Sequence, residues 1–235
     1  MTLCVYALTT VSRGPLRLRG LEGEPLRIVT IERLSAVIGE LRAAPRATRD
    51  HLERYDAVMR RLSERYPSIL PARFATCLDR GELVFILRSR QQAFDAALRH
   101  VRGRAQMTVR IVGERDRGPD KVRATRVARG LSPLNAGRAA PERGEGPGSP
   151  PSGIEYLRHR AAEAAIASFE PLRDAVRRWV RDERVERRER IATVYHLIPR
   201  GSAEAYRRAV IRRANTVGLT TIVSGPFPPY AFTEW

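Results

Sequence analysis

The chain contains almost no lysine and no long apolar run. Lys121 is its single lysine, so 42 of its 43 basic residues are arginine, a bias more typical of a GC-rich genome than of selection for phosphate binding. No segment approaches the roughly 18 to 20 apolar residues that a membrane-spanning helix requires. The opening residues also lack the positive charge that precedes the apolar core of a secretory signal. We therefore expect a cytoplasmic protein with no membrane partner.

Cysteine is scarce as well. The two cysteines, Cys4 and Cys77, are far apart in the sequence and lie in apolar, strand-like surroundings. Neither belongs to a C-x-x-C pair, and thiols of cytosolic proteins are normally reduced. The sequence therefore predicts two buried, reduced thiols.

The motifs that position catalytic groups are missing. The chain has no G-x-S-x-G elbow, no phosphate-binding G-x-x-x-x-G-K-[ST] loop and no G-x-G-x-x-G turn. Its four histidines are scattered without zinc-site spacing, and we interpret His196, in an apolar strand, as a core or edge histidine. The carboxylates are interspersed with arginines, as in surface ion pairs. We predict a protein that is not an enzyme, with no catalytic, cofactor-binding or metal-binding residue.

The formal net charge of +17 indicates an acidic partner or nucleic acid. Acids alternate with arginines over residues 170–190, which we interpret as the salt-bridged face of a helix. The most basic stretch contains Arg207, Arg208, Arg212 and Arg213, and Arg208 and Arg212 share one side of a predicted helix. A solvated face, an acidic protein partner and nucleic acid are three interpretations of this stretch. Nucleic-acid binding is the alternative function, although no RNP-like motif accompanies it.

Hydrophobic periodicity predicts a mixture of strands and helices. Strands are expected at residues 3–9, 26–31, 34–38, 73–76, 106–112, 191–198 and 219–224. Helices are expected at residues 48–66, 91–101, 154–172 and 202–217, with the third pattern resuming as far as Val180. Residues 82–90 are compatible with either a strand or a helix, and residues 34–38 could instead begin a helix.

The fold class expected from this order is α+β, in two small domains. Residues 113–153 contain eight glycines and six prolines, a composition typical of a low-complexity linker, and we predict disorder over 114–150. After residue 106 the order strand, helix, strand, helix, strand predicts a ferredoxin-like domain with helices on one face. We therefore expect an N-terminal α+β domain at 1–105 and a ferredoxin-like domain at 106–235 that contains the linker.

The final segment, GPFPPYAFTEW at residues 225–235, is rich in aromatics and proline. It holds four of the fifteen aromatic residues, namely Phe227, Tyr230, Phe232 and Trp235. Each aromatic ring removes about 150–250 Å² from water when it is buried. One interpretation is that this tail folds back between the two halves and joins them. The other is that part of the tail stays available to a partner, and the two are compatible.

Several segments, taken in order, resemble the GvpL/GvpF family of gas vesicle proteins. They are the opening VYALTT, the segment YPSILPARFATCL, the segment SGIEYLRHR, the strand YHLIPR and the tail GPFPPYAF. The chain departs from the family pattern at Phe227, where tryptophan is common, at Ala231, where serine is common, and at Ala75, where glycine is usual.

The resemblance implies a non-enzymatic accessory protein of gas vesicle assembly, cytoplasmic and associated with the vesicle shell as a minor component. Its implied partners are the hydrophobic shell subunit and other accessory proteins, and no cofactor is implied. The implied fold is two α+β domains, the second ferredoxin-like. The family-motif and interaction candidates are Arg73, Phe74, Tyr156, Arg208, Arg212, Pro226, Phe227, Pro228, Pro229, Tyr230 and Phe232.

Overall fold

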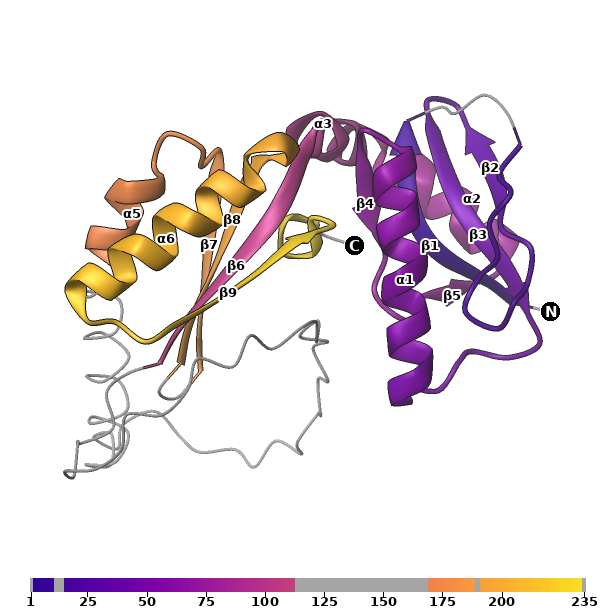
Figure 1. The fold of residues 1–235 in the computed structure, drawn as a ribbon. Helices are drawn as coiled ribbons and strands as arrows, with labels where there is room; N and C mark the ends of the chain where they lie inside the picture. The colour runs from indigo at the N-terminus through magenta and orange to yellow at the C-terminus, as the bar shows by residue number, and fades with distance from the viewer. Residues whose placement is uncertain (1, 11–14, 113–168, 189–190, 234–235) are drawn as a thin grey trace, which may run out of the picture.

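The computed structural model describes residues 2–10, 15–112, 169–188 and 191–233, and it contains two antiparallel sheets with helices packed on them (Figure 1). The predicted linker lies outside the described residues, as do Tyr156 and most of the helix predicted at 154–172. Among the helices that the structure does describe, none is long and apolar enough to cross a membrane.

The first sheet comes from the N-terminal half. Its strands are β1 (Thr2–Thr10), β2 (Arg27–Ile31), β3 (Leu34–Leu41), β4 (Ile69–Pro71) and β5 (Cys77–Leu78). They are ordered β2-β3-β1-β4, and β5 also pairs with β1. Residues from Cys4 to Thr9 are buried on both faces of β1, which confirms the prediction of a central strand.

One face of the first sheet is covered by α1 (Arg49–Arg65). The helix begins where the Thr48 side chain accepts a hydrogen bond from the His51 backbone N–H, a normal N-cap. Its apolar stripe, including Met59 and Leu62, packs against Tyr6 and the neighbouring strands. The helix predicted at 48–66 is therefore confirmed.

The opposite face is covered by α2 (Arg80–Ser89) and α3 (Gln91–Val101); in Figure 1 α2 is seen behind the sheet and α3 at the top, beside β4. Leu83, Phe94 and Leu98 pack there with Leu8 and Leu34 of the strands. Of the ambiguous residues 82–90, residues 82–89 are thus helical and Arg90 is the C-cap of α2. Their helix is fixed by a capping box in which the Asp79 carboxylate accepts the Glu82 N–H and the Glu82 carboxylate accepts the Asp79 N–H, each at 2.8 Å.

The strand predicted at residues 73–76 is wrong. Strand pairing is divided between β4 and β5, and the residues between them form a turn. Ala75 has a φ of 61°, a left-handed conformation that a continuous strand excludes, and the Thr76 hydroxyl donates to the Arg73 carbonyl at 2.8 Å. The apolar composition of this segment predicts that it is buried, but it does not predict the turn.

The prediction of reduced thiols is also wrong in this structure. Antiparallel pairing of β5 with β1 places Cys77 directly opposite Cys4, with 4.1 Å between their Cα atoms, and the two form a disulfide. The expectation was based on the usual redox state of the cytosol. Sequence separation, 73 residues here, gave no indication of the pairing.

The second sheet comes from the C-terminal half. Its strands are β6 (Arg104–Val112), β7 (Asp182–Arg188), β8 (Ile191–Pro199) and β9 (Thr221–Phe227), in the order β7-β8-β6-β9. Helices α5 (Glu170–Val176) and α6 (Ala203–Val217) cover one face, where Leu172 and Val210 pack against Met107 and Val109. Gly218, with a φ of 72°, ends α6 as predicted. Two short 3₁₀ helices, η1 (Arg200–Ser202) and η2 (Tyr230–Phe232), complete the fold.

The interpretation of residues 170–190 as one salt-bridged helix face is wrong. The helix α5 ends at Val176, and residues 182–188 form strand β7, which pairs in continuous register with β8. Among the strands that the structure describes, β7 lies at the edge of the sheet and pairs only with β8. Edge strands tolerate charged residues because charge discourages further strand pairing, and this is why the composition of β7 resembles that of a solvated helix.

Candidate functional site

The aromatic tail docks between the second sheet and the N-terminal unit. The first tail aromatic, Phe227, ends β9 and lies opposite Gln106 of β6. Phe232 is 4% exposed and packs with Leu197 of β8 inside the apolar cluster that α2 and α3 form with the first sheet. We call residues 227–233, Gln106 and Arg200 the tail junction; its η2 helix is the short coil near the C label in Figure 1.

Gln106 holds the tail backbone. Its side-chain oxygen accepts the Ala231 N–H at 2.7 Å, and its side-chain nitrogen faces the Thr108 hydroxyl oxygen at 3.3 Å. Gln106 is 3% exposed, and removal of the tail would take away the Ala231 N–H that its side-chain oxygen accepts. The sequence prediction missed Gln106, because the polar positions of an alternating strand are expected to face solvent and nothing in the sequence distinguishes this one as buried.

Tyr230 extends the tail to the other side of the first sheet. Its ring packs against the cluster formed by α1 and the first sheet, which Phe74 also contacts. Burial, followed by the nearby Tyr55 and Asp56, raises the pKa of the Tyr230 hydroxyl well above its ordinary value. Because Phe232 and Tyr230 pack on different clusters, the tail contacts both core layers of the N-terminal unit. The prediction that the tail folds back and joins the two halves is confirmed.

Arg200 forms a second connection between the two units. Its guanidinium donates to the Tyr66 carbonyl at 3.1 Å, to the Arg104 carbonyl at 3.2 Å and to the Ser63 carbonyl. Ser63 and Tyr66 lie at the C-terminal end of α1, where carbonyls lack helical partners and the helix dipole favours a cation. Burial lowers the pKa of this guanidinium. Sequence reasoning placed Arg200 only within a motif and gave it no role.

The structure brings five of the predicted site residues together in the tail junction, with Pro226 adjoining them in β9 and Phe74 on the same cluster as Tyr230. Phe227, Pro228, Pro229, Tyr230 and Phe232 lie in the tail junction, whereas the ring of Phe74 is half-buried against Tyr55, with 5.5 Å between ring centroids. Exposed positions are occupied by Arg73, Pro226, Arg208 and Arg212. Tyr156 lies outside the described residues.

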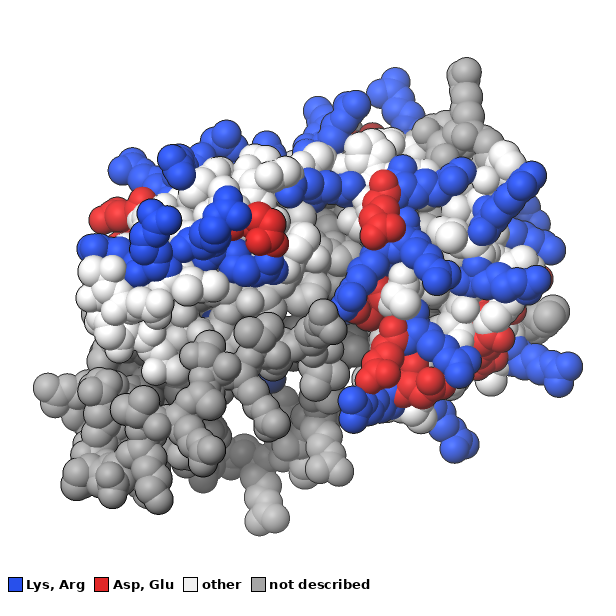
Figure 2. All heavy atoms as spheres, viewed as in Figure 1, with Lys and Arg blue, Asp and Glu red and all other residues white. Residues whose placement is uncertain are grey.

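The outer face of α6 is basic. Arg208, Arg212 and Arg213 are exposed there, and Figure 2 shows arginines gathered over α5 and α6 with few acidic groups among them. Arg207 is engaged differently, because it pairs with Glu204 and also donates to the Gly225 carbonyl at the start of the tail. We call Arg208, Arg212 and Arg213 the α6 basic face.

The one histidine in an apolar strand belongs to a buried polar network. His196 is fully buried; its Nε2 faces the Glu183 carboxylate at 2.8 Å and its Nδ1 faces the Tyr206 hydroxyl. Glu183 also accepts hydrogen bonds from Arg173, at 2.8 and 3.2 Å. The prediction of a satisfied core histidine is confirmed. Among the described residues, no group of three or more His, Cys, Asp or Glu side chains is arranged to hold a metal ion.

Glu183→Gln is expected to weaken the fold and change its acid dependence. The hydrogen bond from His196, followed by those from Arg173, lowers the pKa of Glu183. Its ionised form therefore stabilises the native state above the unfolded pKa of roughly 4.3, and this contribution is lost as the pH falls through the lower folded-state value. We expect a loss of about 1 kcal/mol in the free energy of unfolding at pH 7, because partial exposure screens the pair.

The measurement is urea unfolding of wild type and variant at a series of pH values from 7 to 3. The difference between them should shrink towards acid pH. Asp174→Asn, which changes an exposed carboxylate of α5, is the matched control. It should leave the free energy of unfolding and its dependence on pH unchanged. A difference between wild type and Glu183→Gln that stays constant across the series would contradict the assignment.

Comparison with known proteins gives one family and one fold. The family model described as gas vesicle synthesis protein GvpL/GvpF matches residues 3–234. The crystal structure of the gas vesicle protein GvpF from Anabaena sp. PCC7120 is similar over 100% of this chain and 96% of that chain, with a TM-score of 0.70 and 14% identity. GvpF from Microcystis aeruginosa is similar over 100% and 99%, with a TM-score of 0.69 and 13% identity. A search of curated proteins gave no match.

Proposed function

Because the chain belongs to the gas vesicle synthesis protein GvpL/GvpF family, we propose that it is a minor, shell-associated assembly factor that binds the hydrophobic shell subunit and other accessory proteins. The family consists of gas vesicle structural and assembly proteins and not of enzymes. The observation that carries the proposal is the family match over residues 3–234. A shell subunit with a strongly apolar face needs a partner that covers this face before assembly, since exposed apolar faces and strand edges aggregate.

The buried tail restricts where such partners can bind. Phe227 and Phe232 are almost fully buried, which supports a structural role for these two rings and directs the proposal to other surfaces. We assign the α6 basic face to an acidic accessory protein. A nucleic acid is less well matched, because neither aromatic in the described strands of the second sheet is free to stack on bases. Phe227 is buried in the tail junction, and Tyr195 packs against the N-terminal core and donates to Glu186 at 3.0 Å.

The domain assignment is part of the same proposal. Strand order β7-β8-β6-β9, with α5 between β6 and β7 and α6 between β8 and β9, corresponds to the β-α-β-β-α-β order of a ferredoxin-like unit. We propose that this unit and the N-terminal α+β unit are the two domains, 1–105 and 106–235. Strand β6 begins slightly before this boundary, at Arg104.

Co-expression with the shell subunit and with other accessory proteins of a gas vesicle gene set, followed by capture of the tagged chain, tests the proposal. We expect shell subunit and at least one accessory protein to be retained. Arg208→Glu/Arg212→Glu should reduce retention of an acidic accessory partner by about tenfold at 0.1 M salt and less at higher salt, because facing charges attract in a salt-dependent way.

The matched control is Arg17→Glu/Arg61→Glu, which changes net charge equally at two exposed positions of the N-terminal unit. It should leave retention unchanged. Equal losses in both double variants would assign the effect to net charge and remove the α6 basic face from the proposal. Absence of every shell and accessory protein from the wild-type capture would overturn the proposed function.

A further inference from the structure

Helix α2 presents apolar side chains to solvent as well as to the core. Five consecutive apolar residues, 83–87, occupy its centre, and Leu83 and Leu87 face the first sheet. Phe85 points away from the sheet and is 71% exposed, more than any other large apolar residue that the structure describes. A surface helix normally restricts its apolar residues to one stripe. Phe85 lies outside that stripe, and a large exposed aromatic side chain that borders a cavity can anchor a partner.

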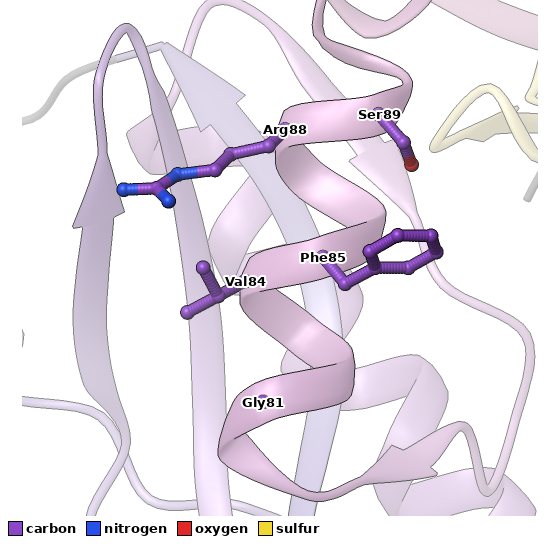
Figure 3. Close-up of a pocket in the computed structure, with 5 residues that line it drawn as sticks. All are labelled: Gly81, Val84, Phe85, Arg88 and Ser89. Atoms are coloured by element: carbon purple, nitrogen blue, oxygen red, sulfur yellow. The ribbon is translucent and has the colours of Figure 1, made fainter.

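The exposed ring borders a shallow cavity. Its volume is about 530 Å³, and its lining residues are Gly81, Val84, Phe85, Arg88 and Ser89 (Figure 3). Val84 and Phe85 supply apolar walls, and Gly81, one helical turn before Phe85, adds no side chain to fill the space. The cavity is open enough to receive an apolar side chain from another protein. We call these five lining residues the α2 groove.

Arg88 is the one charged residue among the five that line the α2 groove. The side chain of Arg88 is 66% exposed, and its ion pair with Glu32 is long, at 3.8 Å. The acids at the start of the helix are occupied in the capping box, since Asp79 and Glu82 each accept the other's backbone N–H. An arriving carboxylate can therefore pair with Arg88 without displacing a close partner. A second copy of the chain is disfavoured, because each copy carries a formal charge of +17.

We propose that the α2 groove binds an apolar segment of the gas vesicle shell subunit that carries a carboxylate about one helical turn from its anchoring side chain. The anchor packs on Phe85 and Val84, and the carboxylate pairs with Arg88. This inference rests on the proposed function and adds to it the surface that holds the shell subunit. It also places the two partners on different units: the shell subunit on the α2 groove and the acidic accessory protein on the α6 basic face.

The test is capture of co-expressed shell subunit by the full-length tagged chain. Phe85→Ser removes the apolar anchor site and Arg88→Glu reverses the charge, and each should lower retention by about tenfold or more, as expected for anchor residues of an interface. Arg88→Lys should retain most of the binding. The matched control Val217→Ser, which changes a 37% exposed apolar residue of α6, should bind as the wild type does. Thermal unfolding should be the same for all four variants, because each site is exposed.

The outcomes distinguish a failure of the α2 groove assignment from a failure of the proposed function. Wild-type retention by both Phe85→Ser and Arg88→Glu would overturn the α2 groove and leave the proposed function standing. Failure of the wild type itself to retain shell subunit would overturn the proposed function, and the inference with it. Sedimentation of the chain alone gives a further check. A concentration-dependent dimer that Phe85→Ser abolishes would identify a second copy as the occupant and overturn the inference.

Discussion

Replacement of Phe232 by alanine is expected to lower the free energy of unfolding by about 3–5 kcal/mol, the usual cost of truncating a buried phenylalanine. The ring is 4% exposed and packs with Leu197 and with the cluster of the first sheet, and the Arg184 guanidinium lies 5.7 Å from its centroid. The loss of stability is large because removal of the ring leaves a cavity where the two units contact each other. Urea unfolding measures it, and the melting temperature should fall by roughly 10 °C.

Phe85→Ala is the matched control for this experiment. It makes the same chemical change at a phenylalanine that is 71% exposed, and we expect an effect within about 0.5 kcal/mol of wild type. Equal stability losses for Phe85→Ala and Phe232→Ala would mean that the tail is not packed as described. Phe232→Leu should recover much of the loss, because it restores most of the apolar volume.

The second large effect is expected from Arg200→Met. The methionine keeps the apolar stem but removes the donors to the carbonyls of Ser63, Tyr66 and Arg104. Hydrogen bonds from a charged group contribute about 1.5–3 kcal/mol, and the carbonyls left behind are costly to bury unpaired. We expect a loss of about 3 kcal/mol.

This variant should also change the cooperativity of unfolding. Arg200 connects the end of α1 to the second sheet, so its loss should separate one transition into two when unfolding is followed by probes in each unit. Arg208→Met, at an exposed arginine of α6, is the control and should unfold like the wild type. A single transition with unchanged stability in Arg200→Met would contradict the role given to this residue.

The elements that could be predicted from sequence are those whose pattern reflects burial. Helix α1 follows an apolar stripe with a cap and a following proline, and β6 alternates apolar residues such as Met107 and Val109 with polar ones. The aromatic tail was predictable for the same reason, since so much apolar area has to be covered. In these segments the hydrophobic pattern of the sequence matches the burial of the residues in the folded chain.

The elements that could not be predicted depend on contacts distant in sequence. Strand β7 is charged because it lies at a sheet edge, and an edge is a property of the complete sheet. The role of Arg200 depends on where α1 ends, and the roles of Gln106 and of the Cys4–Cys77 pair depend on which strands become neighbours. Single-residue chemistry identifies these groups as polar or reactive, but only the topology supplies their partners.

The docking of the tail has a consequence for synthesis of the chain. Thr233 contacts Pro71 across 162 positions, and Ala231 contacts Gln106 across 125. At roughly 5–20 residues per second, a ribosome needs on the order of 10–30 s to proceed from the first contact partner to the second. During this time the N-terminal core has been translated, but the tail that covers it has not. A nascent or prematurely ended chain therefore presents the Phe232 site to chaperones and proteases. Only a chain that includes Phe232 and has left the ribosome can cover this site.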